Sequence, residues 1–92
     1  MKYAVVTTQT FRKSLKRLKK SGRFKEAELQ TVLDFLVNGR KLSKQYRDLH
    51  LTGELREFRE CHIRADLLLV YKIEKEELVL VLVRIGSHSK VL

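Results

Sequence analysis

Apolar residues in the first half of the chain recur at the spacing of an α-helix. Up to residue 20 they fall at positions i, i+4 and i+7, and within 24–37 at i, i+3, i+4 and i+7. Such positions lie on one face of a helix, so both segments are predicted to be amphipathic helices. Thr8 or Thr10 suits the cap of the first helix, and Gly22 suits its end. An Asn-Gly pair follows the second helix and is expected to end it.

Four further segments have the patterns of β-strands. Residues 3–7 and 78–85 are rich in β-branched and other apolar residues, and 67–73 is apolar on both faces for most of its length. Residues 55–63 are mixed and polar, which indicates a half-exposed strand. The charged turn at 74–77 is short, so the strands on either side of it are expected to pair antiparallel.

These elements follow the order β-α-α-β-β-β. Two amphipathic helices must bury their apolar faces, and a sheet offers the surface for this. The sequence therefore predicts an α+β domain with two helices packed on one antiparallel sheet. Residues 38–53 form the one long connection, and the chain contains no proline. Ninety-two residues suffice for one core, so we expect residues 1–92 to form a single domain.

Several observations disfavour a membrane, secreted or metal-dependent protein. The N-terminus lacks the apolar core of a signal peptide, and the longest apolar run, 67–71, is too short to span a bilayer. Cys61 is the only cysteine, so no internal disulfide can form, which suits the cytoplasm. One cysteine and three scattered histidines show no zinc-ligand spacing. We expect a cytoplasmic protein without a membrane segment, metal or other cofactor.

The net charge of +9 is concentrated in one part of the chain. Residues 10–47 contain twelve Lys and Arg but three acidic residues, whereas the remaining residues contain eight of each sign. This distribution predicts one strongly positive surface, which attracts phosphate backbones or anionic headgroups. The simpler alternative is a solvated helix face that aids solubility. The residues expected to bind RNA or the ribosome are Lys13, Lys16, Arg17, Lys20, Arg40, Lys41, Lys44 and Arg47.

His62 and Asp66 stand four residues apart, next to the most apolar run of the chain. If Arg64-Ala65 forms a two-residue turn, Ile63 pairs with Asp66 and His62 lies opposite Leu67. Both polar side chains then lie at the same end of the sheet.

Two more polar residues are expected at that end. The last strand runs antiparallel to the strand before it, so its C-terminal end returns to the rim where the previous strand begins. Arg84 is near this end, and His88 follows it. Strand topology therefore predicts that His62, Asp66, Arg84 and His88 gather at one rim.

These residue types suit the cleavage of RNA without a metal. The ribose 2′-hydroxyl must lose a proton as it attacks phosphorus, and the leaving 5′-oxygen must gain one. Histidine can do either, and aspartate can act as a base or orient a histidine. Arginine can stabilise the charge that develops on the phosphoryl oxygens. Ordinary alternatives are His62 as a surface residue, Asp66 as a turn residue, Arg84 as a partner of Glu60 or Glu57, and His88 as a loop residue.

Two stretches carry a family resemblance, LTGELREFRECHIRADLLLVYK and LVRIGSHSKVL. They resemble the YafQ-type branch of the RelE/ParE toxin superfamily, bacterial toxins of toxin–antitoxin pairs. The shared pattern includes R-[ED]-x-H-[IV]-x-P-D and R-x-G-[ST]-H, and the match covers nearly all of 48–92. The resemblance implies a RelE-like fold and a ribosome-dependent endoribonuclease that cuts mRNA in the A site, inhibits translation and is silenced by an antitoxin. It also implies that the catalytic positions are His62, Asp66, Arg84 and His88.

Three positions depart from the family pattern. The family's histidine in H-x-L-x-G aligns with Leu49, and a histidine follows one place later at His50. His50 is a further catalytic candidate if its loop shifts, because alternation along a strand would turn it away from the other candidates. Ala65 replaces a proline before Asp66, and Leu92 replaces a terminal aromatic residue suited to base stacking. These departures are consistent with reduced or altered activity.

Two other functions compete with the ribonuclease. One is a ParE-like toxin that inhibits DNA gyrase, although that branch has no use for the four-residue set. The other is a non-catalytic nucleic-acid-binding module that uses 10–47 alone and exposes aromatic residues among the basic ones. The aromatic residues there are Phe11, Phe24, Phe35 and Tyr46, and the first three are largely needed for burial. Binding to a membrane surface is less favoured, because the helices lack an aromatic anchoring face.

Overall fold

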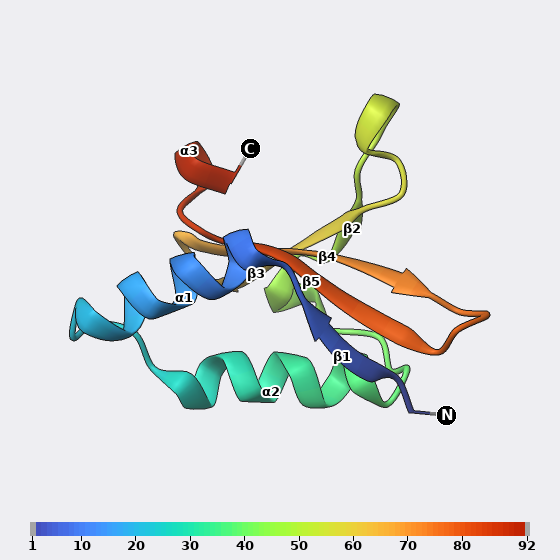
Figure 1. Ribbon diagram of the computed structural model, residues 1–92, viewed down its shortest axis with the longest axis horizontal. Helices are drawn as coiled ribbons and strands as arrows, with labels where there is room; N and C mark the ends of the chain where they lie inside the picture. The colour runs from blue at the N-terminus through green and yellow to red at the C-terminus, as the bar shows by residue number, and fades with distance from the viewer. Residues whose placement is uncertain (1, 92) are drawn as a thin grey trace.

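A five-stranded sheet with the order β1-β5-β4-β3-β2 forms the centre of the computed structural model (Figure 1). The structure describes residues 2–91 and the side chains of residues 2–89. The elements in chain order are β1 (Ala4–Thr7), α1 (Gln9–Lys20), α2 (Glu26–Val37), the 3₁₀ helix η1 (Lys44–Tyr46), β2 (Leu49–His50), the 3₁₀ helix η2 (Gly53–Leu55), β3 (Arg59–Arg64), β4 (Leu67–Glu74), β5 (Val79–Gly86) and α3 (His88–Val91).

The strand pairing is mostly antiparallel. β2 pairs with β3, β3 with β4 and β4 with β5 in antiparallel fashion, as the short connections predict. β1 instead pairs with β5 in parallel, which is possible because the helices and the following strands separate the two along the chain. The expected α+β fold is therefore confirmed, with β2 and α3 as additional short elements.

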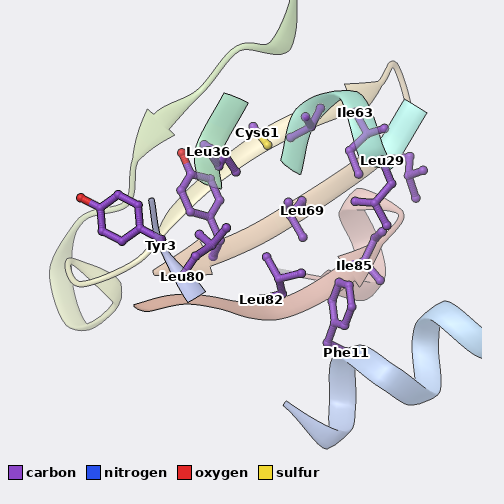
Figure 2. Packing of buried hydrophobic residues seen from close by; sticks show 13 residues of the cluster. Tyr3, Phe11, Leu29, Leu36, Cys61, Ile63, Leu69, Leu80, Leu82 and Ile85 are labelled. Atoms are coloured by element: carbon purple, nitrogen blue, oxygen red, sulfur yellow. The ribbon is translucent and has the colours of Figure 1, made fainter. Parts of the chain in front are cut away.

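The two long helices bury their apolar faces on one side of the sheet (Figure 2). Phe11 of α1 and Val32 of α2 are 2% and 0% exposed, and they pack in one cluster with Leu69 and Leu82 from the central strands. This is the burial that the helical spacing predicts. Figure 1 shows α3 on the other side of the sheet from α2.

Thr8 is the cap of the first helix. Its Oγ1 accepts a hydrogen bond from the backbone N–H of Phe11 at 3.0 Å, and it donates one to the carbonyl oxygen of Val83 at 2.7 Å. The second contact ties the start of α1 to β5. At the other end, Gly22 adopts a left-handed backbone with φ of 77°, as expected for a residue that ends a helix.

Several predicted boundaries differ from the structure, most of them by one or two residues. The strand predicted at 55–63 begins at Arg59, because η2 and the bond from the N–H of Phe58 to the carbonyl of Leu55 hold the preceding residues in a turn. The last strand begins at Val79, because Leu78 has a left-handed φ of 55°. The second helix begins at Glu26. Within residues 2–91, no helix is long and apolar enough to cross a membrane.

Candidate active site

A bulge in β5 decides which side of the sheet Arg84 occupies. Val70 pairs with Arg84 and Tyr71 pairs with Leu82, so Val83 has no partner on β4. Leu82 and Ile85 are both buried in the core although they are three residues apart. Strict alternation from Leu82 would have placed Arg84 among the core residues. The bulge instead turns Arg84 to the opposite face, where its side chain is exposed.

The face opposite α1 and α2 is called here the outer face. Two rows of paired residues cross it, because directly paired residues of antiparallel strands share a face. The members of the first row are Glu60, Val70 and Arg84, and those of the second row are His62, Leu68 and Gly86. α3, which begins at His88, contacts β4 and β5 beside the second row.

The structure brings the four main candidates to one end of this sheet. His62 is half-buried near the end of β3, and Arg84 is exposed near the end of β5. Asp66 is exposed in the turn between β3 and β4, and His88 is exposed as the first residue of α3. Three strand ends and one helix start therefore meet at the rim that strand topology predicts.

The predicted register of this turn was wrong by one position. The two-residue turn is Ala65-Asp66, so Arg64 pairs with Leu67, and His62 lies opposite Leu68. Between His62 and Arg64 the register shifts by a bulge, which the sequence alone did not indicate.

The turn itself is anchored to the helical side of the molecule. Arg64 Nη1 donates a hydrogen bond to the carbonyl of Arg23 at 3.4 Å and lies 3.8 Å from Glu28 Oε1. These contacts connect Arg64, at the end of β3, with Arg23 in the segment between α1 and α2 and with Glu28 of α2.

Arg84 is available to bind an anion. The alternative that it pairs with Glu60 or Glu57 is not realised, because none of the ion pairs found among the described side chains involves Arg84. An exposed guanidinium without a carboxylate partner keeps its planar fork free for a phosphate.

His50 does not join the other candidates. Leu49 pairs with Glu60 and therefore shares the outer face, whereas His50 pairs with Arg59 and lies on the opposite face. His50 instead lines a pocket of about 730 Å³ near the end of α2. The other position of interest, Leu92, lies outside the described residues.

A buried polar network borders the same pocket. The Tyr71 hydroxyl donates to Asp48 Oδ1 at 2.5 Å, and Arg59 Nη2 lies 3.2 Å from Asp48 Oδ2. Burial and the bond to Asp48 raise the pKa of Tyr71 above its ordinary value. Burial, with a smaller contribution from Asp48, also raises the pKa of the Cys61 thiol to about 12, so this thiol is no nucleophile at neutral pH.

The predicted basic residues lie on two segments of the chain, which are called here the two basic clusters. Lys13, Lys16, Arg17 and Lys20 are exposed along α1, whereas the other four follow α2 and line the pocket. The four pocket residues are Arg40, Lys41, Lys44 and Arg47. Along the chain, α2 lies between the two clusters.

Sequence reasoning did not assign a role to Glu60. This residue is 6% exposed and lies on the outer face two positions before His62. The signal that could have found it is the period of two along a strand, which puts residues 60 and 62 on one side. Among residues 2–89, no group of three His, Cys, Asp or Glu side chains is arranged to hold a metal ion.

Comparison with known proteins now gives this geometry a context. The family model described as a bacterial toxin of type II toxin–antitoxin system, YafQ, matches residues 3–92. A protein of Haemophilus influenzae named as a YafQ toxin is 37% identical over 62 residues. The match covers 65% of this chain and 61% of that protein, so this chain spans about three fifths of that relative's length.

Solved structures agree over the whole chain. A crystal structure described as a metal-bound toxin from Helicobacter pylori superimposes with a TM-score of 0.90 at 44% identity, covering 100% of both chains. A chain of the E. coli DinJ-YafQ toxin–antitoxin complex superimposes with a TM-score of 0.87 at 22% identity, covering 100% of this chain and 99% of that one. The second likeness shows a shared fold. The motif resemblance is thus confirmed, and the chain belongs to the YafQ family of bacterial toxins of type II toxin–antitoxin systems.

Proposed function

We propose that this toxin is a ribosome-dependent mRNA endoribonuclease that needs no metal, acts in the cytoplasm and inhibits translation. One observation carries the proposal: Arg84, with no carboxylate partner among residues 2–89, lies on the outer face at the sheet end that also holds His62, Asp66 and His88. A cation for phosphate and several proton-transfer groups at one rim are what phosphodiester cleavage requires.

The proposed reaction is an attack of the ribose 2′-oxygen on the adjacent phosphorus. The new bond joins the 2′-oxygen to phosphorus, and the bond from phosphorus to the 5′-oxygen breaks. One rim side chain takes the 2′-hydroxyl proton, and another gives a proton to the leaving 5′-oxygen. Arg84 binds the phosphoryl oxygens as their charge increases. The products are a 2′,3′-cyclic phosphate and a 5′-hydroxyl.

The proposed dependence on the ribosome follows from the small size of the domain, which has 92 residues. Efficient attack needs the 2′-oxygen, phosphorus and 5′-oxygen in line, and a domain of this size has little surface to hold RNA in that geometry. In the proposed complex, the two basic clusters bind ribosomal RNA through its phosphates, and the ribosome positions the codon in its A site. Both clusters consist of exposed side chains.

An antitoxin is the proposed protein partner. The related E. coli toxin was crystallised in the DinJ-YafQ toxin–antitoxin complex. Given a net charge of +9, we propose that an acidic antitoxin segment binds here across the basic residues and the rim. Association should slow as ionic strength rises, and an association rate that is indifferent to salt would argue against this mode of binding.

Cleavage of a short mRNA on programmed ribosomes tests the proposal. The purified toxin should cut the A-site codon and leave a cyclic phosphate, and it should cut the same mRNA far more slowly without ribosomes. Equal rates on naked and translated mRNA would refute ribosome dependence. Inhibition of gyrase supercoiling without RNA cleavage would identify the ParE-like alternative, and RNA binding without either activity would identify a binding module.

A further inference from the structure

Among the side chains of residues 2–89, two polar atoms on the outer face are buried without hydrogen-bond partners. They are Glu60 Oε2 and His62 Nδ1. Glu60 is also the one charged residue that is classed as buried among the described side chains, at 6% exposure. Buried polar atoms in native proteins are nearly always paired, so an unpaired carboxylate oxygen in a candidate site calls for a functional explanation.

The two atoms are chemically complementary. Glu60 and His62 are consecutive residues on one face of β3, so their Cα atoms lie about 7 Å apart and their side chains are neighbours. A carboxylate oxygen accepts hydrogen bonds, and the Nδ1–H of a neutral histidine donates one. A hydrogen bond between the two atoms, direct or through one bridging water, would satisfy both.

Among the described side chains, the other charged groups near the rim do not form ion pairs with Glu60. Arg84 lies in the same row but on the far side of Val70, and no ion pair joins it to Glu60. Asp66 lies in the turn, and His88 begins α3. His62 lies two positions along the same face of β3 and carries the other unpaired buried polar atom of this face.

We infer that Glu60 is a positioning residue that holds His62 in the Nδ1–H tautomer, and this inference rests on the proposed ribonuclease activity. With Nδ1 donating to Glu60, the lone pair of Nε2 is free to take the 2′-hydroxyl proton as the new bond to phosphorus forms. The Glu60 carboxylate then stabilises the imidazolium that results, as carboxylates do for catalytic histidines. His88 is left to give its proton to the 5′-oxygen. His62 is therefore the base and His88 the acid.

The tautomer can be measured in the free protein. Two-bond ¹⁵N–¹H spectra of the histidine rings should show the Nδ1–H tautomer of His62 in the wild type. Glu60→Leu, which removes the acceptor, should convert it to the Nε2–H tautomer that free histidine prefers. Circular dichroism and thermal unfolding verify that the variant is folded, and Glu60→Val, which also lacks an oxygen acceptor, replaces it if it is not. An unchanged tautomer in the folded variant would overturn the inference.

Cleavage provides the second readout. Glu60→Gln should lower the rate of single-turnover cleavage on saturating ribosomes by about 10²-fold. The ribosome concentration that gives half of the maximal rate should change by about twofold or less. Glu60→Asp should recover part of this loss, and Glu54→Gln, an exposed acid in η2, is the matched control. A loss confined to ribosome affinity would contradict the positioning role. If the wild-type protein does not cleave mRNA, the proposed function fails. The tautomer of His62 in that case still tests the contact between Glu60 and His62.

Discussion

The hydroxyl of Thr8 connects a helix cap with the bulge that orients Arg84, so its removal should affect both stability and activity. In Thr8→Ala, the N–H of Phe11 loses its acceptor and the carbonyl of Val83 loses its donor. A lost N-cap costs about 1 kcal/mol, and the loss of a partly buried hydrogen bond costs about another 1 kcal/mol. The expected total is about 2 kcal/mol, which lowers Tm by roughly 10 °C in a domain of this size.

Urea unfolding followed by circular dichroism measures this loss directly. Thr8→Ser keeps the hydroxyl and should stay within about 0.5 kcal/mol of the wild type, since serine caps helices as well as threonine does. Thr10→Ala is the matched control, because Thr10 lies inside α1 and is exposed. At a temperature where all variants are folded, Thr8→Ala should also cleave mRNA about tenfold more slowly, because a less firmly held bulge misplaces Arg84.

Two results would refute this reasoning. If Thr8→Ala unfolds within about 0.5 kcal/mol of the wild type, the hydroxyl does not contribute the two bonds seen in the structure. If Thr8→Ala loses stability but Thr8→Ser loses equally, the effect belongs to the methyl group and its packing instead.

Three further predictions concern the opposite face and the interior. His50→Ala should keep cleavage within about fivefold of the wild type, because His50 lies on the face away from the rim; a loss of about 10²-fold would show that it reaches the substrate. Tyr71→Phe should destabilise the protein by about 1–3 kcal/mol in urea unfolding, because Asp48 loses a buried donor, and an unchanged midpoint would contradict the network. Because the Cys61 pKa is raised to about 12 in the folded protein, its contribution to stability is complete below pH 9 and is lost as the pH rises towards 12. Between pH 8 and 11, the free energy of unfolding of Cys61→Ala should therefore fall by roughly 3 kcal/mol less than that of the wild type. Equal decreases in both proteins would show that the thiol is not the cause.

The helices and the order of the strands could be predicted from the sequence because their signals are local. The helical spacing around Phe11 and within 24–37, together with the capping residue Thr8, determines two amphipathic helices with little tertiary information. The apolar run 67–73 likewise identifies the central strand, and short connections fix its antiparallel neighbours.

The side of the sheet on which each candidate lies could be predicted only in part, because it depends on bulges and register. Val83 is one more apolar residue in an apolar strand, and nothing in its local sequence marks that it lacks a partner on β4 or that its carbonyl accepts a hydrogen bond from the distant Thr8. Without that bulge, alternation would place Arg84 on the core side. For the Leu49–His50 pair, by contrast, strand alternation alone predicts that His50 turns away, and the pairing with β3 agrees.

Single-turnover cleavage by His88→Ala on programmed ribosomes tests the central claim most directly. His88 is exposed at the start of α3, so its replacement should leave thermal unfolding almost unchanged. If His88 donates the proton to the leaving 5′-oxygen, the rate should fall by about 10²-fold or more. Arg84→Ala should be equally impaired, through loss of charge stabilisation on the phosphate. A His88→Ala protein that cleaves within a few-fold of the wild type would contradict the proposed ribonuclease mechanism.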